Sequence, residues 1–345
     1  MAPDSAAAFA PGRVNLIGEH TDYNLGLALP FAIAEGITAT AHVLPAGDHV
    51  VAIADDLGER DEFDPVAPAP AHGWRAFARG VVAELGLAGV SVPPARVSFG
   101  GSVRPGAGMS SSAALEVALT MSLLALADET LERTAIAKLC SRVENEWVGA
   151  NTGLLDQLAS LYGAPDTALR IDFAVLSTDP VPLELHGWRL ATLDSRERHV
   201  HASSGYNERR AECMRACELL GVHSLREADA SATAELPEPL ARRVRHVLTE
   251  NARVEEAVGA LRGGELRALA ALLDASHASL RNDYEISTPA VEAARDRMLE
   301  AGAAGARLIG GGFGGSVLGL FPPERPPPAD AHEVRPGAGA HLLPA

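Results

Sequence analysis

A loop of glycines and serines carries the clearest chemical signal in the sequence. It precedes an apolar helical stretch that starts near residue 113 and consists of Gly106, Ala107, Gly108, Met109, Ser110, Ser111 and Ser112. Glycine lets a backbone approach an anion closely, and the free N–H groups and dipole of a helix start attract phosphate. Serine hydroxyls can add bonds to phosphate or to a hard metal ion, whereas a helix cap needs only one of them. The loop therefore predicts phosphate binding more strongly than a capped helix alone.

The phosphate loop differs from those of two common nucleotide-binding classes. A Walker A motif places Lys and then Ser or Thr after its second glycine. Here Met109 follows the second glycine, and Lys138 is the only lysine in the chain. A protein kinase is excluded for a similar reason, since it needs a strand lysine and a His-Arg-Asp loop. Phosphate charge must then be met by arginine, backbone N–H groups and a metal.

A second glycine cluster, residues 310–315, contains a Gly-x-Gly-x-x-Gly pattern. In a dinucleotide-binding fold a helix follows that pattern, whereas here the residues after it are typical of a strand. Nicotinamide binding is therefore disfavoured.

Strands and helices alternate along the chain, with no internal repeat. Strands are expected at residues 10–20, 26–40 and 95–99, and helices at 113–127, 131–147 and from 154. The second half is expected to have strands within 168–193, helices at 208–220, 239–261, 265–281 and 288–301, and strands at 306–309 and 316–321. The order of strands and helices changes near residue 163, which predicts two mixed α/β domains, residues 1–163 and 164–345.

The composition and charge of the chain disfavour several classes of partner. The chain has 345 residues, 47% of them hydrophobic, and 45 acidic against 29 basic residues give a net charge of −16. So acidic a surface disfavours nucleic acid and anionic membranes as partners. The three cysteines, Cys140, Cys213 and Cys217, are too few for a disulfide framework. With no signal peptide or long apolar run at the sequence level, we expect a cytoplasmic protein with free thiols.

Three segments resemble the signature motifs of the galacto-, homoserine, mevalonate and phosphomevalonate (GHMP) kinase superfamily. Residues 10–24, APGRVNLIGEHTDYN, look like the signature that opens galactokinases. Residues 105–114, PGAGMSSSAA, and 309–316, IGGGFGGS, look like the second and third motifs. The similarity extends to about residue 321. It implies ATP-dependent phosphorylation of the anomeric hydroxyl of galactose, giving α-D-galactose 1-phosphate at the start of galactose catabolism.

The resemblance also implies a fold. It is a two-domain α/β architecture with an N-terminal domain like domain 2 of ribosomal protein S5 and a C-terminal ferredoxin-like domain. The active site would lie in the cleft between them.

Site residues carry over from the family motifs position by position. Asp156 matches the catalytic base, and Arg13 matches an arginine beside the transferred phosphoryl group, where a guanidinium offsets developing charge. The residues that match sugar contacts are Glu19, His20, Thr21, Asp22, Gly153 and Tyr206. Without the resemblance, residues 19–22 would be read as a polar turn and Asp156 as an ordinary carboxylate in the first turn of a helix.

The remaining implied ligands are ATP and Mg²⁺. The resemblance assigns ATP to the loop of residues 106–112 and, more loosely, to Trp74 near the adenine. Ser112 and Glu144 match the magnesium ligands, and one hydroxyl plus one carboxylate leaves the open coordination that Mg²⁺ prefers.

The sequence departs from the family pattern mainly at its C-terminus. After Phe321 a proline-rich stretch replaces the expected helix, so we expect part of a sheet face to be uncovered. Three alternatives stay open: a kinase for galactosamine or arabinose, a sugar-sensing relative without turnover, and a fold-damaged pseudoenzyme. The expected partners are galactose and Mg-ATP, and the expected assembly is a monomer or weak homodimer.

Overall fold

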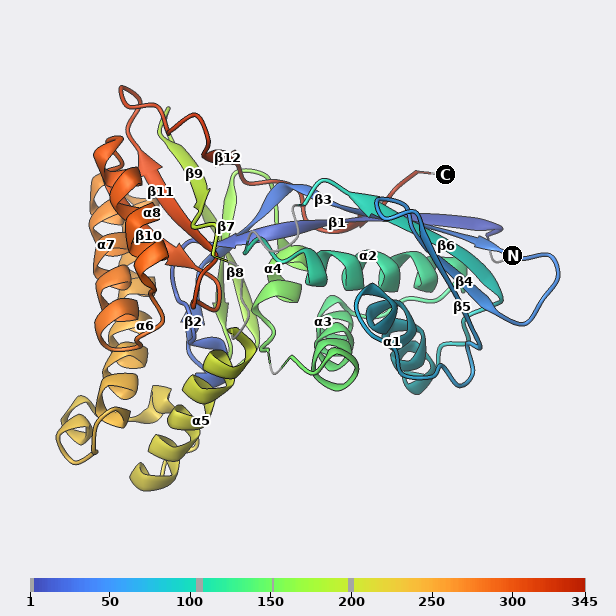
Figure 1. The fold of residues 1–345 in the computed structure, drawn as a ribbon, viewed down its shortest axis with the longest axis horizontal. Helices are drawn as coiled ribbons and strands as arrows, with labels where there is room; N and C mark the ends of the chain where they lie inside the picture. The colour runs from blue at the N-terminus through green and yellow to red at the C-terminus, as the bar shows by residue number, and fades with distance from the viewer. Residues whose placement is uncertain (1–2, 104–107, 151, 198–201, 345) are drawn as a thin grey trace.

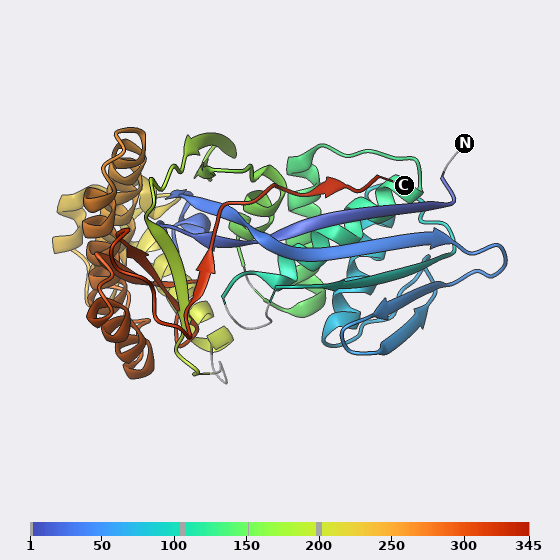
Figure 2. The ribbon, with the colours of Figure 1, turned by 90° about the horizontal axis from the view of Figure 1, so that it is seen from above.

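A six-stranded sheet forms the N-terminal half of this computed structural model, which describes residues 3–103, 108–150, 152–197 and 202–344. The strand order is β13-β1-β3-β6-β4-β5. The strands are β13 (His341–Leu342), β1 (Ser5–Asn15), β3 (Pro30–Val43), β6 (Ala95–Gly101), β4 (Val50–Ala54) and β5 (Glu59–Phe63). Figure 1 shows helices packed beneath one face of this sheet, and Figure 2 shows the opposite face without helices over it.

The central helix of this half is α2 (Ser111–Leu126). It packs on β1 and β3 and is contacted on its other sides by α1 (Trp74–Leu87), α3 (Arg133–Arg142) and α4 (Leu155–Tyr162). Its sequence, SSAALEVALTMSLLAL, is apolar nearly all round, which is typical of a helix enclosed on every side. Burial of α2 fixes the position of its first residues, which follow directly after the phosphate loop.

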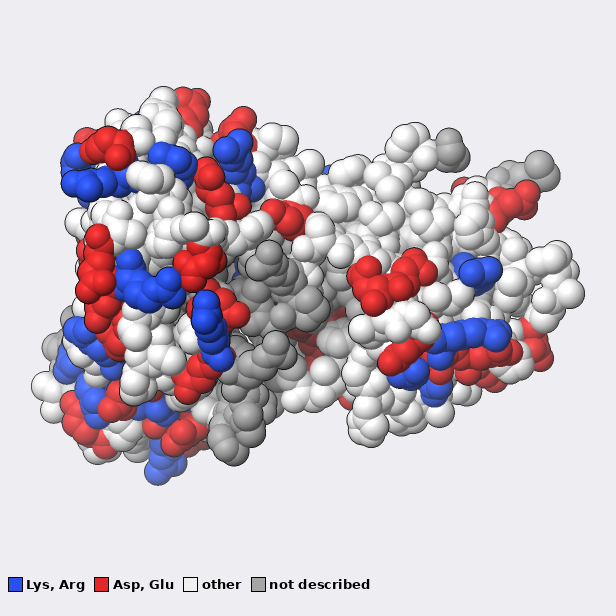
Figure 3. Space-filling model, turned by 45° about the horizontal axis from the view of Figure 1, so that its top comes forward, with Lys and Arg blue, Asp and Glu red and all other residues white. Residues whose placement is uncertain are grey.

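Two smaller sheets lie in the second half. A three-stranded sheet joins β2 (Leu27–Ala28) to the hairpin of β7 (Thr167–Asp172) and β8 (Ser177–Pro182). A four-stranded sheet has the order β10-β11-β9-β12, made of β10 (Gly305–Ile309), β11 (Ser316–Phe321), β9 (Arg189–Asp194) and β12 (His332–Val334). Its helices are α5 (Ala202–Leu220), α6 (Leu240–Arg262), α7 (Leu266–Asn282) and α8 (Pro289–Glu300). On the face in Figure 3, acidic and basic side chains are intermixed over this helical half.

The C-terminal segment returns to the N-terminal sheet. After β12, Pro336 forms an isolated bridge with Ile33, and β13 pairs antiparallel with β1 through Ala8 and Phe9. In Figure 2 the last segment runs along the edge of the long strands. Backbone pairing therefore links the final residues to the first half of the chain.

The expectation of an uncovered sheet face is wrong. Residues 322–331 contain no helix, as their prolines predict, but Ala191 and Leu193 on β9 are 0% and 2% exposed. Ala331 packs against the same hydrophobic cluster, and Asp330 pairs with Arg297 of α8 at 3.0 Å. Ala331 therefore helps to bury the cluster that contains Ala191 and Leu193.

Several elements were not expected from the sequence. They are α1, β4 and β5, and α5 begins at residue 202 rather than 208, which puts Tyr206 inside the helix. The strand expected after the second glycine cluster is confirmed as β11. Over the described ranges, no helix combines the length and the apolar character needed to cross a bilayer.

Candidate functional site

A cavity of about 280 Å³ brings together most of the predicted catalytic and sugar-binding residues. Those lining it are Arg13, Glu19, His20, Asp22, Gly153, Asp156 and Tyr206. They come from β1 and the turn after it, the loop before α4 and the first turn of α4, and the first turns of α5. The cavity also takes its wall from the turn between β10 and β11, so segments distant in sequence enclose it.

The central contact in the cavity is an ion pair. Arg13 donates from Nε to Asp156 Oδ1 at 2.6 Å, and its NH1 donates to the Gly108 carbonyl at 2.6 Å. Ser110 Oγ donates to Asp156 Oδ2 at 2.5 Å. Burial alone lowers the pKa of the Arg13 guanidinium, but the charges of Asp156 and Glu19 outweigh it and raise that pKa. The phosphate loop, Arg13 and Asp156 are therefore tied together at one point.

Two further carboxylates face the cavity. Burial raises the pKa of Glu19, although Arg307 and Arg13 oppose the shift, and the Gly310 N–H donates to Glu19 Oε1 at 2.8 Å. Burial also raises the pKa of Asp22 to about 6, with the charges of Asp156 and Glu19 adding to the shift. Buried carboxylates that face one cavity suit a ligand rich in hydroxyl groups.

Gly153 lines the cavity against a carboxylate, whereas Thr21 lies outside the cavity lining. A Cβ on Gly153 would lie 1.9 Å from Asp22 Oδ2, so only glycine lets this loop touch the carboxylate. Thr21 is fully buried and does not line the cavity; its hydroxyl lies 3.0 Å from the Gly18 carbonyl and 2.7 Å from that of Leu27. Thr21 therefore supports the turn and we do not retain it as a ligand contact.

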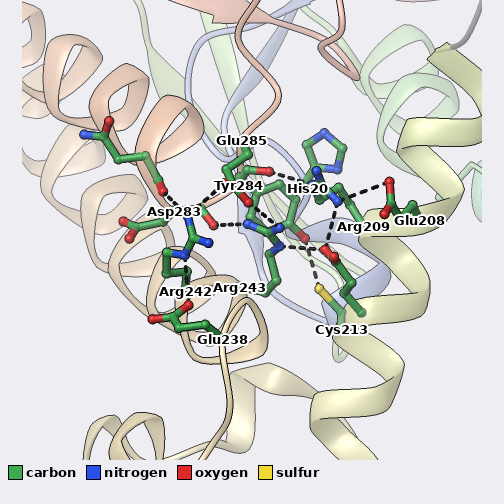
Figure 4. A network of polar contacts seen from close by, with 12 residues as sticks. His20, Glu208, Arg209, Cys213, Glu238, Arg242, Arg243, Asp283, Tyr284 and Glu285 are labelled. Carbon is green, nitrogen blue, oxygen red and sulfur yellow. Dashed lines mark hydrogen bonds and ion pairs between the residues drawn. The ribbon is translucent and has the colours of Figure 1, made fainter.

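His20 is held inside an aromatic cluster at the cavity wall. Its ring centroid lies 5.0 Å from that of Tyr206 and 4.8 Å from that of Tyr284. Burial lowers its pKa to about 3, and the neighbouring His246 adds to the shift. His20 is thus a neutral imidazole at physiological pH. Figure 4 shows it beside Tyr284 and the polar contacts behind the cavity.

The two predicted magnesium ligands are in contact. Ser112 forms a side-chain hydrogen bond with Glu144, and Thr152 Oγ1 donates to Glu144 Oε2 at 2.6 Å. Glu144 is 4% exposed, and burial, followed by the charge of Asp156, raises its pKa. A buried carboxylate with another negative charge nearby and a hydroxyl beside it fits a small hard cation. The donor set therefore suits Mg²⁺.

A second cavity, of about 520 Å³, adjoins the start of α2. It is lined by Trp74, Phe77, Phe99 and Asp56, together with Ser111 and Ser112. Trp74 therefore lies where aromatic rings and the phosphate loop meet. Gly106 and Ala107 of the predicted loop lie outside the described residues. Met109 is buried, and its carbonyl accepts the Arg13 N–H at 3.1 Å.

The sequence did not single out several residues of these cavities. Gly310, Gly311, Gly312 and Asn207 line the first, and the glycine-rich third motif was the available signal for three of them. Phe77, Phe99 and Asp56 line the second, and no motif marks them. Only the folding of α1, β6 and the turn between β4 and β5 brings those side chains to the phosphate loop.

Comparison with protein families identifies three matching regions. The galactokinase galactose-binding signature matches residues 2–43, the GHMP kinases N-terminal domain matches 74–164, and the GHMP kinases C-terminal domain matches 257–339. Galactokinase from Mycobacterium tuberculosis is 43% identical over 324 residues, which is 92% of this chain and 89% of that protein. Galactokinase from Streptomyces coelicolor is 42% identical over 90% of this chain and 83% of its own length.

Two solved structures have a fold similar to that of this chain. Lactococcus lactis galactokinase, solved in complex with galactose, superimposes with a TM-score of 0.91 at 29% identity and covers 99% of this chain and 96% of its own. A mevalonate kinase at 17% identity gives a TM-score of 0.68, covers 92% of each chain and shares the fold alone. The cavity and the ion pair at its centre therefore sit in a GHMP kinase fold.

Proposed function

Since the chain belongs to the galactokinase family and is an ATP-dependent sugar kinase, we propose that the 280 Å³ cavity binds galactose and that Asp156 and Arg13 act on its anomeric hydroxyl. The observation that carries the proposal is the Arg13–Asp156 pair, which faces the cavity and also contacts the carbonyl of Gly108 in the phosphate loop. One end of the pair meets the sugar, and the other meets the γ-phosphate.

In the proposed reaction the anomeric oxygen attacks the γ-phosphorus of ATP. The bond from that phosphorus to the bridging oxygen breaks, so ADP leaves and the sugar 1-phosphate remains. Asp156 accepts the hydroxyl proton, while Arg13 Nε and Ser110 Oγ hold its two carboxylate oxygens in place. Most of the rate comes from this positioning and from the positive charge of Arg13 near the transferred group.

The proposed sugar contacts are Glu19, His20, Asp22, Gly153 and Tyr206, all of which line the cavity. Glu19 and Asp22 accept hydrogen bonds from hydroxyls, and the raised pKa of each carboxyl reflects its burial at the cavity. We also assign the second cavity, with Trp74, to the adenine end of ATP and the loop that ends at Ser112 to its phosphates.

Mg²⁺ is a further part of the proposal. Ser112 and Glu144 would hold the ion, and the hydrogen bond between them keeps the two side-chain oxygens close together. When bound, Mg²⁺ neutralises part of the charge on the ATP phosphates. Thr152 and Gln157 both donate to Glu144 Oε2, at 2.6 and 3.1 Å, and so orient the carboxylate.

The remaining expectations stay proposals. We propose a division near residue 163, a monomer or weak homodimer, and a cytoplasmic enzyme, which agrees with three free cysteines. Galactosamine and arabinose stay open as alternative acceptors.

Galactose-dependent release of ADP, with the product identified by phosphorus NMR, tests the proposed reaction. We expect turnover that requires galactose and yields only the 1-phosphate. ATP hydrolysis that ignores galactose, or a product phosphorylated at another carbon, would overturn it. A faster reaction with galactosamine or arabinose would keep the chemistry and reassign the sugar.

A further inference from the structure

A chain of hydrogen bonds runs from His20 away from the cavity into the protein. His20 Nδ1 lies 2.7 Å from the Tyr23 hydroxyl, which lies 3.0 Å from the hydroxyl of Tyr284. The Tyr284 hydroxyl lies 3.0 Å from Cys213 Sγ, which accepts from Asn24 Nδ2 at 3.7 Å. On its cavity side, His20 Nε2 lies 3.2 Å from the Gly311 carbonyl oxygen.

The direction of this chain is determined by its cavity end. A carbonyl oxygen can only accept, so His20 Nε2 carries the proton and donates to Gly311. A neutral imidazole has one N–H, so Nδ1 must accept from Tyr23. Each hydroxyl has one proton, so Tyr284 donates to Tyr23, and Cys213 donates its S–H to Tyr284.

The properties of the individual groups agree with that direction. Burial lowers the pKa of His20 to about 3, which keeps the ring neutral. Burial also raises the pKa of Cys213 to about 11, so the thiol keeps the proton that it donates. Asn24 donates from the same nitrogen to the His20 carbonyl at 2.9 Å, which orients its amide.

The chain also links the parts of the protein that enclose the cavity. His20, Tyr23 and Asn24 belong to the turn after β1, Cys213 to α5, and Tyr284 to the segment after α7. Arg209 of α5 donates to the Tyr284 carbonyl at 2.7 Å, which holds that segment against the helix (Figure 4). Any shift of α5 or of Tyr284 would therefore reach the His20 ring.

We propose that Tyr23, Tyr284 and Cys213 are positioning residues that hold His20 as the Nε2–H tautomer, so that its one N–H, which faces the Gly311 carbonyl at the cavity wall, is shared with one sugar hydroxyl as a bifurcated donor. This inference rests on the proposed galactose site. It divides the sugar contacts by polarity, because Glu19 and Asp22 can only accept from hydroxyls while ionised, whereas His20 can only donate. The hydroxyl that faces His20 is then recognised as an acceptor.

The first experiment measures the tautomer in the protein without sugar or ATP. Histidine-selective ¹⁵N labelling with NMR identifies the protonated ring nitrogen, and His20→Asn assigns the resonance. We expect a neutral Nε2–H ring in the wild type and a moved Nδ1 resonance in Tyr23→Phe. The matched control is Tyr162→Phe, whose lost hydroxyl bonds to Thr134 and lies outside the cavity lining.

The second experiment measures the dissociation constants of galactose and of its 2-, 3-, 4- and 6-deoxy forms by calorimetry. In the wild type, removal of the hydroxyl that faces His20 should weaken binding about tenfold, as for one neutral hydrogen bond. Tyr23→Phe should bind galactose about tenfold more weakly than the wild type does. Removal of that same hydroxyl from the sugar should weaken binding to this variant by no more than a further twofold. The losses for the other deoxy sugars should match those of the wild type.

The cysteine provides a conservative pair of variants. Cys213→Ser keeps a donor and should bind galactose within about twofold of wild type. Cys213→Ala and Tyr284→Phe each break the chain and should both weaken galactose binding. A charged or Nδ1–H ring in the wild type, or an Nδ1 resonance that ignores Tyr23→Phe, would overturn the inference. So would an equal loss for every deoxy sugar in Tyr23→Phe, which indicates a general structural effect. The tautomer is measured without sugar, so a wild type that does not bind galactose would contradict the proposed function and leave the chain intact.

Discussion

Arg13 and Asp156 lie 143 positions apart in the sequence, yet Arg13 Nε donates to Asp156 Oδ1 at 2.6 Å. The pair joins β1 to the first turn of α4 at the wall of the 280 Å³ cavity. Arg13 is 7% exposed, so its charge is nearly desolvated and depends on this carboxylate for compensation. Asp156 is in turn held by both Arg13 and Ser110, which fixes the orientation of its carboxylate.

The role of Asp156 as base leads to the first prediction. Asp156→Asn should keep the fold and bind galactose within about threefold of wild type, but lower kcat by about 10²-fold or more, as expected for loss of a positioned base. Calorimetry and a coupled ADP assay measure the two quantities. The control is Asp166→Asn, a change at an exposed loop carboxylate that should leave both unchanged. Turnover within threefold of wild type would remove Asp156 from the mechanism.

The second prediction concerns the metal. Glu144→Ala removes the only charged ligand proposed for Mg²⁺ and should raise the Mg²⁺ concentration for half-maximal activity by about tenfold or more. Direct titration of Mn²⁺ binding by electron paramagnetic resonance, with ATP present, should show the same weakening. Glu146→Ala alters an exposed carboxylate two residues away and serves as control. If both titrations are unchanged in Glu144→Ala, the residue does not bind the metal.

Asp22 gives a prediction for pH dependence. Its pKa is about 6, so the carboxylate that accepts sugar hydroxyls is ionised above pH 6 and becomes protonated below it. The affinity for galactose should therefore fall by about tenfold between pH 7 and pH 5, because only the ionised form binds well. In Asp22→Asn the affinity should be weaker at neutral pH and should lose most of this dependence. An affinity of the wild type that stays constant over this range would contradict the assignment.

Gly153 offers a steric test. A methyl group at this position would collide with the Asp22 carboxylate, whose Oδ2 lies 1.9 Å from the Cβ position. Gly153→Ala should thus displace Asp22 and lower kcat/KM for galactose by about 10- to 100-fold, as for a misplaced positioning group. Gly259→Ala, in α6 with open space around its Cβ position, is the matched control. Equal kcat/KM in the two variants would show that Asp22 does not need this close contact.

The sequence predicted the local parts of the site well because they lie in short motifs. Residues 19–22 follow one another in the sequence, and so do residues 110–112. The members of each group therefore lie close together whatever the fold. The helix over most of residues 113–127 was also predictable, since its apolar run is long and uninterrupted. By contrast, β4 and β5 are short, and Glu59–Phe63 begins with four charged residues, a composition that does not favour a strand.

Contacts between distant segments could not be predicted from the residues alone. One example is the contact of Tyr23 with Tyr284 and of Tyr284 with Cys213. These side chains meet only because α5 and the segment after α7 pack against the turn that follows β1. Thr21 shows the reverse difficulty, since it belongs to the motif but its hydroxyl faces backbone carbonyls within the turn. Likewise Ala331 packs against the cluster around Ala191, a contact between distant segments that no local pattern reveals.

The most direct test of the central claim compares kcat/KM for galactose and glucose under identical ATP and Mg²⁺. The two sugars differ only in the orientation of the 4-hydroxyl, which the proposed contacts Glu19, His20, Asp22 and Tyr206 must distinguish. Moving it should break one charge-assisted hydrogen bond and cost roughly 2–4 kcal/mol, or about 30- to 1,000-fold in kcat/KM. We therefore expect galactose to be preferred by at least about 30-fold. Glucose within fivefold of galactose would show that these four residues do not form the site that recognises the sugar hydroxyls.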